Sequence, residues 1–296
     1  MTDKRDGPRI WADLSVCRRC GTCESVCPNG VFAWHDDAIE VLHLGRCIRC
    51  GHCLSVCPKS AFEHPYLKSE RFEEAKTTGP AEKENLKAIL AQRRSCRQFT
   101  SEAVSEQEME DILDVARYTP SPTNSQNVRF VLFQTKDSIR ELSMHIAKYY
   151  LDLERQLSDP KIRAETDAQV GKRTVDIYGF HLPAIIERFR AVQKGDDQLF
   201  YNAPMVIALY ASGMSHLATA SCSMTALEML LAAETIDLAG CFNGYALTAL
   251  TRDRATASYA EIPPGYTPGA VLTLGHPAVH YHLVPPRRKP RIIRRK

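Results

Sequence analysis

Eight of the eleven cysteines lie within 41 residues near the amino end, in two equal groups with the same internal spacing. Gaps of two, two and three residues separate the four cysteines of each group, and a proline follows the fourth. Thiolates spaced in this way can surround a metal centre, whereas disulfides would suit an exported chain, and residues 1–16 contain no apolar signal segment. Metal ligation is therefore the chemistry that we expect. The two groups are Cys17, Cys20, Cys23 and Cys27, and Cys47, Cys50, Cys53 and Cys57.

The two cysteine groups form an internal repeat with an offset of thirty residues, sharing R-C-G-x-C-x-S-V-C-P and a later Phe32 or Phe62. This region resembles the dicluster bacterial ferredoxins, whose cysteine run is the same. A pair of zinc sites is the alternative, but zinc requires neither the third closely spaced cysteine nor the proline. The resemblance implies two [4Fe-4S] clusters that pass single electrons to an acceptor elsewhere in the chain. Its crossed ligation would give one cluster Cys17, Cys20, Cys23 and Cys57, and the other Cys47, Cys50, Cys53 and Cys27.

Length and composition predict two globular domains. A chain of 296 residues is longer than one domain usually is, and the charged stretch 68–84, which contains Gly79-Pro80, is typical of a linker. We expect a ferredoxin-like domain over 1–75 and a second domain over 76–296. With 44% hydrophobic and 25% charged residues and no long apolar run, the sequence predicts a cytoplasmic protein without a membrane partner.

The basic residues are concentrated at the carboxyl end. Seven of them fall in residues 287–296, which leaves 31 basic and 35 acidic residues in the rest, although the net charge is +3. A tail of this kind could bind nucleic acid or anionic lipid, but a solvated tail is the favoured interpretation and a nucleic-acid partner is not expected.

Residues beyond 76 alternate between helical and strand patterns, which predicts an α+β fold. Short apolar runs rich in β-formers occur at 128–134, 205–211 and 270–274. Helical periodicity covers 105–118, 138–157 and 216–233, and Ser105 with Glu108 fits a capping box. Residues 158–200 are mostly charged with apolar islands, so we expect a helical excursion that either covers a pocket or contacts a second subunit.

Four stretches of this second region carry chemistry suited to a phosphate or a planar heterocycle. Arginine forks bind phosphate, side-chain amides can bind the polar edge of a ring, and backbone N–H groups of a glycine-bracketed turn can face it. The stretches are Arg93–Phe99 with three guanidinium groups, the amide-rich loop Ser121–Asn127, the turn Gly240–Gly244, and Arg287–Pro290.

In this order the stretches resemble the FMN-dependent nitroreductase family over about residues 84–290. The resemblance implies a mostly antiparallel central sheet flanked by helices, bound FMN, and a homodimer with FMN sites lined by both subunits. Arg93 and Ser95, together with Arg94, would hold the phosphate or ribityl end, and Arg288 with Arg287 would close on the phosphate. Arg97 would reach the pyrimidine edge near N1. Asn124, with Ser125 and Gln126, would contact the same edge or the ribityl chain. Asn243 and Gly244 would contact the N5 side of the ring.

The combination of clusters and flavin predicts an oxidoreductase that takes electrons from reduced ferredoxin or flavodoxin and delivers hydride to a small electrophile. The acceptor would be a nitroaromatic, a quinone or an activated alkene. No residue stands out as a catalytic acid, and solvent can supply the proton. Cys96, Cys222 and Cys241 are expected to be structural, and Tyr178, Phe180 and Phe200 to cover the pocket. The alternatives are a redox sensor and an electron-transfer protein with a protein or nucleic-acid partner.

Overall fold

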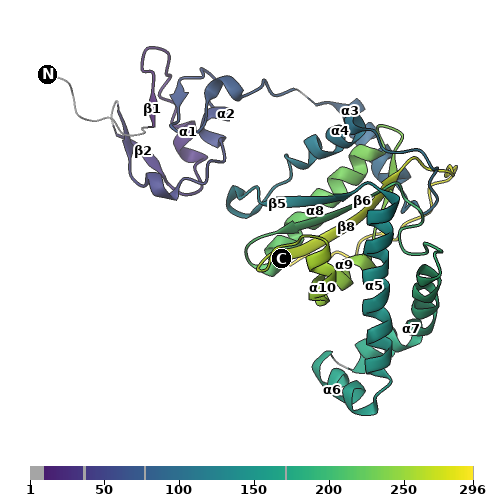
Figure 1. The fold of residues 1–296 in the computed structure, drawn as a ribbon. Helices are drawn as coiled ribbons and strands as arrows, with labels where there is room; N and C mark the ends of the chain where they lie inside the picture. The colour runs from purple at the N-terminus through teal and green to yellow at the C-terminus, as the bar shows by residue number, and fades with distance from the viewer. Residues whose placement is uncertain (1–9, 36–37, 77, 171, 296) are drawn as a thin grey trace. The chain divides into compact units, whose positions relative to one another are not determined.

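The computed structural model describes residues 10–35, 38–76, 78–170 and 172–295, although not every side chain at 38 and within 160–193 (Figure 1). The chain forms two compact units. Unit 1 comprises Met1–Gly79 with the short segment Pro122–Ser125, and unit 2 comprises Pro80–Ser121 with Gln126–Lys296. The sequence predicted that the first domain ends at residue 75. In the structure the first segment of unit 1 ends at Gly79, and Pro80 begins a helix.

Unit 1 is small and contains two similar halves. Its strands form two antiparallel pairs, β1 with β4 and β2 with β3. Each half also contributes one short helix, α1 or α2, which begins after a Cys-Gly pair whose glycine is the N-cap. The elements are β1 (Trp11–Ala12), α1 (Thr22–Ser25), β2 (Phe32–His35), β3 (Ala38–Val41), α2 (His52–Ser55) and β4 (Phe62–Glu63), with 3₁₀ turns at Leu44–Arg46 and Ser69–Arg71.

The core of unit 1 joins the two halves of the repeat. Phe32 and Phe62 occupy equivalent positions, are each 2% exposed, and pack with their ring centroids 4.9 Å apart. Few other apolar side chains are buried with them, and several cysteines pack against the same cluster. A core of this size supplies limited hydrophobic stabilisation, so bound clusters would add substantially to the stability of this unit.

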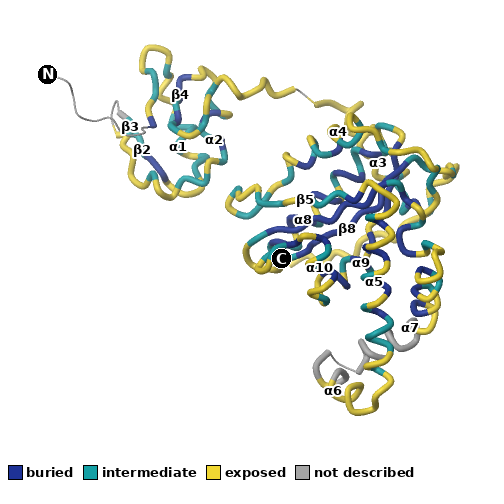
Figure 2. The backbone as a smooth tube through the Cα atoms, in the orientation of Figure 1, coloured by how far each residue is buried: buried dark blue, intermediate teal, exposed yellow. Residues whose placement is uncertain are grey.

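Unit 2 is built on a four-stranded antiparallel sheet with the order β5-β6-β8-β7. Strand β6 is central, and all seven of its residues are buried, which is why its sequence is apolar without alternation (Figure 2). The strands are β5 (Val128–Phe133), β6 (Met205–Ala211), β7 (Ala239–Phe242) and β8 (Thr267–Gly275).

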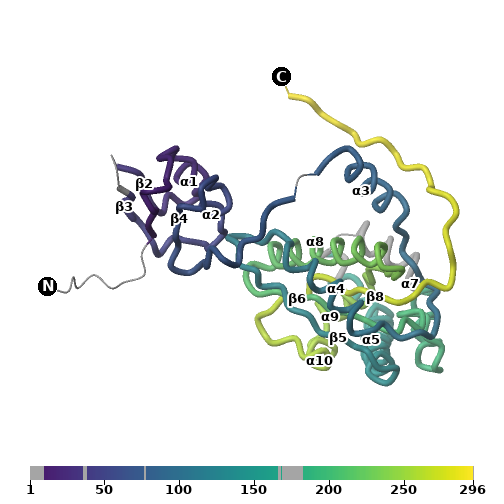
Figure 3. The backbone as a smooth tube through the Cα atoms, turned by 90° about the horizontal axis from the view of Figure 1, so that it is seen from above, coloured from purple at the N-terminus to yellow at the C-terminus, as the bar shows by residue number. Residues whose placement is uncertain are grey.

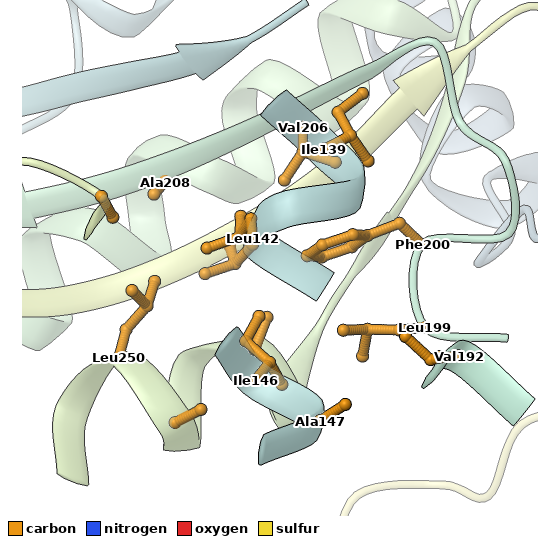
Figure 4. Packing of buried hydrophobic residues seen from close by; sticks show 14 of the residues in the cluster. Ile139, Leu142, Ile146, Ala147, Val192, Leu199, Phe200, Val206, Ala208 and Leu250 are labelled. Atoms are coloured by element: carbon orange, nitrogen blue, oxygen red, sulfur yellow. The ribbon is translucent and has the colours of Figure 1, made fainter. Parts of the chain in front are cut away.

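Helices cover both faces of this sheet. Val206, Ala208 and Tyr210 of β6 pack with α5, α7 and α9, whereas the alternate residues of β6 pack with α4 and α8. Figure 3 separates α8 from α5 on either side of the strands, and Figure 4 shows Leu142 and Ile146 of α5 in the first of these clusters. The helices are α3 (Pro80–Gln92), α4 (Glu106–Ala116), α5 (Lys136–Leu157), α6 (Pro160–Val170), α7 (Lys172–Gln193), α8 (Ser215–Ala233), α9 (Gly244–Arg252) and α10 (Arg254–Tyr259), with a 3₁₀ turn at Pro122–Asn124.

The expected α+β class and antiparallel sheet are confirmed, as is the capping box of Ser105 and Glu108 at the start of α4. The prediction of a turn over Gly240–Gly244 was wrong. Residues up to Phe242 form the edge strand β7, Asn243 caps the next helix, and Gly244 begins it. Among the described residues, no helix is both long and apolar enough to cross a bilayer.

Candidate functional site

The eight clustered cysteines line two separate cavities in unit 1. Each cavity takes three cysteines from one half of the repeat and the fourth from the other half. This is the grouping that the crossed ligation of dicluster ferredoxins would require. The first cavity is lined by Cys17, Cys20, Cys23 and Cys57, and the second by Cys27, Cys47, Cys50 and Cys53.

The backbone around these cavities directs N–H groups at the sulfur atoms in both halves. Arg19 and Arg49 each have a φ of 53°, a conformation that costs a non-glycine residue about 1 kcal/mol or more. In this conformation their N–H groups donate to Sγ of Cys17 and Cys47, each at 3.4 Å. The strained backbone therefore positions hydrogen-bond donors for the cysteines, because N–H donors stabilise a negatively charged sulfur ligand.

A second pair of backbone donors follows the last cysteine of each half. The N–H of Val31 donates to Cys27 Sγ at 3.4 Å, and the N–H of Ala61 donates to Cys57 Sγ at 3.3 Å. These four backbone bonds occur at matching positions of the repeat, so both cavities receive two of them.

The cavities fit a cluster better than a single zinc ion. A zinc ion needs its four sulfur atoms at about 2.3 Å from one centre, and among the described residues no three such ligands are close enough together to hold a single metal ion. Burial raises the pKa of Cys23 and raises that of Cys53 to about 12, so these thiols are protonated at neutral pH until a metal centre displaces the protons. Thr22 has the opposite effect on an exposed cysteine, because its hydroxyl donates to Cys20 Sγ at 3.3 Å and lowers the pKa of that thiol.

In unit 2 the predicted phosphate-binding stretch lies beside the edge strand β7. Ser95 forms a parallel bridge with Gly240, and the N–H of Cys96 donates to the carbonyl oxygen of Gly240 at 3.0 Å. A Cβ at position 240 would lie 2.5 Å from the carbonyl oxygen of Thr273 in the neighbouring strand β8, so only glycine fits at this position of β7. The stretch that begins at Arg93 and the segment around β7 are therefore brought together, and their predicted contacts with FMN stay predictions.

Arg97 lines an open cavity of about 550 Å³ at the surface of unit 2, together with Gln98, Gln198 and the carboxylate of Asp197. A second guanidinium group, a phenol and a further amide in this cavity are donors that an anionic or heterocyclic ligand requires. Sequence reasoning missed these partners, because each is a single polar residue within a helix or loop with no motif around it. They are Arg188, Tyr201 and Asn202.

The other predicted arginines are placed differently. The guanidinium of Arg94 donates to the carbonyl oxygens of Ala91 and Arg93, each at 2.7 Å, and to that of Leu283 at 3.3 Å. Arg94 therefore ties the end of α3 to the carboxyl-terminal segment. Arg287 and Arg288 are exposed on this segment, which has no helix or strand after β8 over its described residues. Their predicted phosphate contacts stay predictions.

Asn243 has a role in the fold that the sequence did not indicate. Its side chain is 5% exposed, Oδ1 accepts from the N–H of Ala246 at 3.0 Å, and Nδ2 donates to the carbonyl oxygen of Leu199 at 2.8 Å. The amide thus caps α9 and holds the loop before β6. Gly244, which follows it, is exposed.

The amide-rich loop has an irregular backbone. Thr123, Asn124 and Gln126 have φ values of 52°, 54° and 46°, and the N–H of Gln126 donates to Ser121 Oγ at 2.9 Å. Asn124 and Ser125 belong to unit 1 by the division above, whereas Arg97 belongs to unit 2.

The three remaining cysteines are buried, as expected for structural residues, and burial raises the pKa of Cys222 to about 12. The prediction that Phe200 covers a pocket was wrong, because it is fully buried in the core. The side chains of Tyr178 and Phe180 lie outside the described part of the structure.

Two protein families account for most of the chain. Residues 90–276 match the Nitroreductase family, and residues 9–58 match the 4Fe-4S dicluster domain. The chain belongs to the nitroreductase family. It is a nitroreductase-family oxidoreductase that carries a ferredoxin-type domain at its amino end. No curated protein matches the sequence.

Solved nitroreductases have the same fold as unit 2. A nitroreductase with bound FMN from Desulfitobacterium hafniense DCB-2 is 21% identical, with a TM-score of 0.50 over 69% of this chain and 94% of its own. A nitroreductase with bound FMN from Bacteroides fragilis NCTC 9343 is 17% identical, with a TM-score of 0.51 over 71% of this chain and 98% of its own. In this nitroreductase-family chain, the cluster domain is thus an addition to a complete nitroreductase fold.

Proposed function

We propose that this chain takes electrons singly at two [4Fe-4S] clusters, transfers them to FMN, and reduces a small electrophilic acceptor. The observation that carries this proposal is the presence, in one chain, of two four-cysteine cavities and a nitroreductase fold. A flavin enzyme that accepts hydride from a nicotinamide needs no clusters, so the clusters favour reduced ferredoxin or flavodoxin as the donor. Weak or absent activity with NADH or NADPH follows.

FMN is the cofactor that the donor groups of unit 2 support. Both solved structures described above contain FMN, and the cavity beside Arg97 and Arg188 offers cationic donors to an anionic ligand. When bound, FMN would accept electrons one at a time and pass two of them on with a proton. A cation such as Arg97 at about 4 Å from a negative ring would stabilise it by about 4 kcal/mol at an effective dielectric constant of 20.

The electron donor would dock on an arginine patch that surrounds the cavities. Four exposed arginines flank the cysteines, Arg18 lines the first cavity, and Arg49 lines the second and lies 4.5 Å above the ring of Tyr66. An acidic carrier protein is attracted to such a surface, which raises its association rate at low salt. The arginine patch consists of Arg18, Arg19, Arg46 and Arg49.

Few side-chain groups need to take part in the reduction of the acceptor. Two electrons and one proton form the hydride equivalent that reaches the acceptor, and solvent supplies the further proton of the product. The acceptor is a nitroaromatic, a quinone or an activated alkene, and we propose that the functional unit is a homodimer.

The decisive experiment compares electron donors in anaerobic protein loaded with FMN, iron and sulfide. Reduced ferredoxin should drive turnover of a nitroaromatic, at a rate that falls as ionic strength rises. A Cys50→Ser variant should lose this turnover but retain FMN and the activity driven by dithionite, which reduces flavin directly. Equal turnover with NADPH in both proteins, or a ferredoxin rate that does not depend on salt, would contradict the proposed electron entry.

A further inference from the structure

Two aromatic side chains place a ring N–H at equivalent positions of the repeat. Trp34 and His64 are thirty residues apart, each following the phenylalanine of its half. Trp34 Nε1 lies 3.5 Å from Cys23 Sγ, and His64 Nε2 lies 3.2 Å from Cys47 Sγ. Cys23 lines the first cavity and Cys47 the second, so each ring contacts a different cavity.

The direction of the His64 hydrogen bond follows from its other nitrogen. The N–H of Tyr66 donates to His64 Nδ1 at 3.1 Å, so Nδ1 is the acceptor nitrogen and Nε2 carries the hydrogen in the neutral ring. His64 Nε2 therefore donates to Cys47 Sγ. The ring is held in place, because it is 7% exposed and packs edge-on against Tyr66 with centroids 5.7 Å apart.

Trp34 is fixed in a comparable way by a different contact. Its backbone N–H donates to Glu24 Oε2 at 3.1 Å, which ties strand β2 to helix α1, where Cys23 lies. An indole nitrogen can only donate, so the direction of this bond is unambiguous.

Side-chain donors are the groups that can distinguish the two cavities. The backbone bonds from Arg19 and Arg49, and from Val31 and Ala61, are repeated in both halves with nearly equal distances. A difference in reduction potential between the clusters must therefore come from groups that the repeat does not share. At the equivalent positions 34 and 64, one half has an indole and the other has an imidazole.

We propose that Trp34 and His64 are positioning residues that each raise the reduction potential of the one cluster whose cysteine they contact. The inference rests on the proposed function, because it requires [4Fe-4S] clusters in these cavities. A hydrogen bond to a ligand sulfur stabilises the more negative, reduced cluster more than the oxidised one, and such bonds are a known determinant of cluster potential. Each ring thus contributes to the potential of its own cluster independently of the other ring, and the first cluster also receives the Thr22 hydroxyl bond to Cys20 Sγ.

The test is a redox titration of the anaerobic full-length protein, followed by electron paramagnetic resonance. His64→Phe and Trp34→Phe keep an aromatic ring but remove its N–H. Each should lower the potential of a different cluster and leave the other unchanged. The expected loss is about tenfold in the equilibrium constant for one-electron reduction, or about 59 mV. His64→Gln, which restores an N–H donor, should recover part of the shift.

Iron and sulfide content separates the possible failures. Both clusters present with unshifted potentials in the two phenylalanine variants, or a single variant that shifts both clusters equally, would overturn the inference. If a phenylalanine variant fails to hold a cluster, His64→Gln is compared with the wild type: a lowered potential of the second cluster with the first unchanged supports the inference, and unchanged potentials of both clusters overturn it. Wild-type protein without iron and sulfide would instead overturn the proposed function.

Discussion

Replacing Asn243 with alanine should destabilise the nitroreductase-like unit without a direct effect on flavin binding. The wild-type amide is buried, and both of its polar atoms have partners, the N–H of Ala246 at 3.0 Å and the carbonyl oxygen of Leu199 at 2.8 Å. Alanine removes both hydrogen bonds and leaves the Leu199 carbonyl without this donor in a buried environment.

The size of the effect can be worked from these two bonds. Loss of the helix cap costs about 1 kcal/mol, and a buried carbonyl oxygen without its donor costs about 1–3 kcal/mol. The sum, about 2–4 kcal/mol, corresponds to a decrease in Tm of roughly 5–15 °C for a unit of about 200 residues.

Circular dichroism is the suitable probe of unfolding. Trp11 and Trp34, the only tryptophans of the chain, both belong to unit 1, so tryptophan fluorescence would report on the wrong unit. The helices are concentrated in unit 2, and the far-ultraviolet signal therefore follows that unit. Measurements with saturating FMN and without it separate ligand stabilisation from the intrinsic effect.

Ser105→Ala is the matched control. Ser105 also caps a helix, because its Oγ accepts from the N–H of Glu108 at 3.3 Å, but its side chain is exposed. It should cost about 1 kcal/mol, clearly less than Asn243→Ala. The reasoning is refuted by an Asn243→Ala protein with an unchanged Tm in the absence of FMN and a large loss of FMN affinity, since the amide would then be a flavin ligand.

Three further predictions concern other parts of the chain. Gly269→Ala should cost about 1–3 kcal/mol, because the added methyl would lie 2.9 Å from Cys222 Sγ, and an unaltered thermal transition would be evidence against it. Burial and the hydrogen bond to Glu141, at 2.9 Å, raise the pKa of Tyr259 to about 12, so its contribution to stability is complete below pH 10 and lost as pH rises through 12. Tyr259→Phe should remove that loss, which alkaline unfolding curves of the two proteins can test. Cys57→Ser should deplete the cluster of the first cavity more than that of the second, as iron content and electron paramagnetic resonance would reveal; equal depletion speaks against the sharing of Cys57.

The sequence predicted the features that depend on a few neighbouring residues, namely the cysteine turns and the buried strand β6. The cysteine spacing repeats because each half must turn its backbone in the same way, and Gly21 and Gly51 adopt φ values of 70° and 77° at matching positions. The apolar run of β6 indicated a buried strand, because a strand covered on both faces needs no polar residues.

Features that depend on tertiary contacts were beyond the sequence. Strand β7 contains a glycine and ends before a helix-capping asparagine, so it has the composition of a turn, and only its pairing with β8 makes it a strand. Arg188 approaches the cavity of Arg97 from a helix ninety residues away in sequence, and no local pattern records such a meeting. Asn243 was predicted to contact FMN from its position in a motif, whereas its burial and partners are those of a structural residue.

The exchange of one cysteine between the halves has a consequence for how this protein is made. Because Cys57 completes the first cavity, a chain emerging from the ribosome cannot close that cavity until the second half has been synthesised. The other three cysteines of this cavity leave the ribosome earlier. Neither half is a usable fragment by itself. Insertion of either cluster therefore awaits the finished pair of repeats.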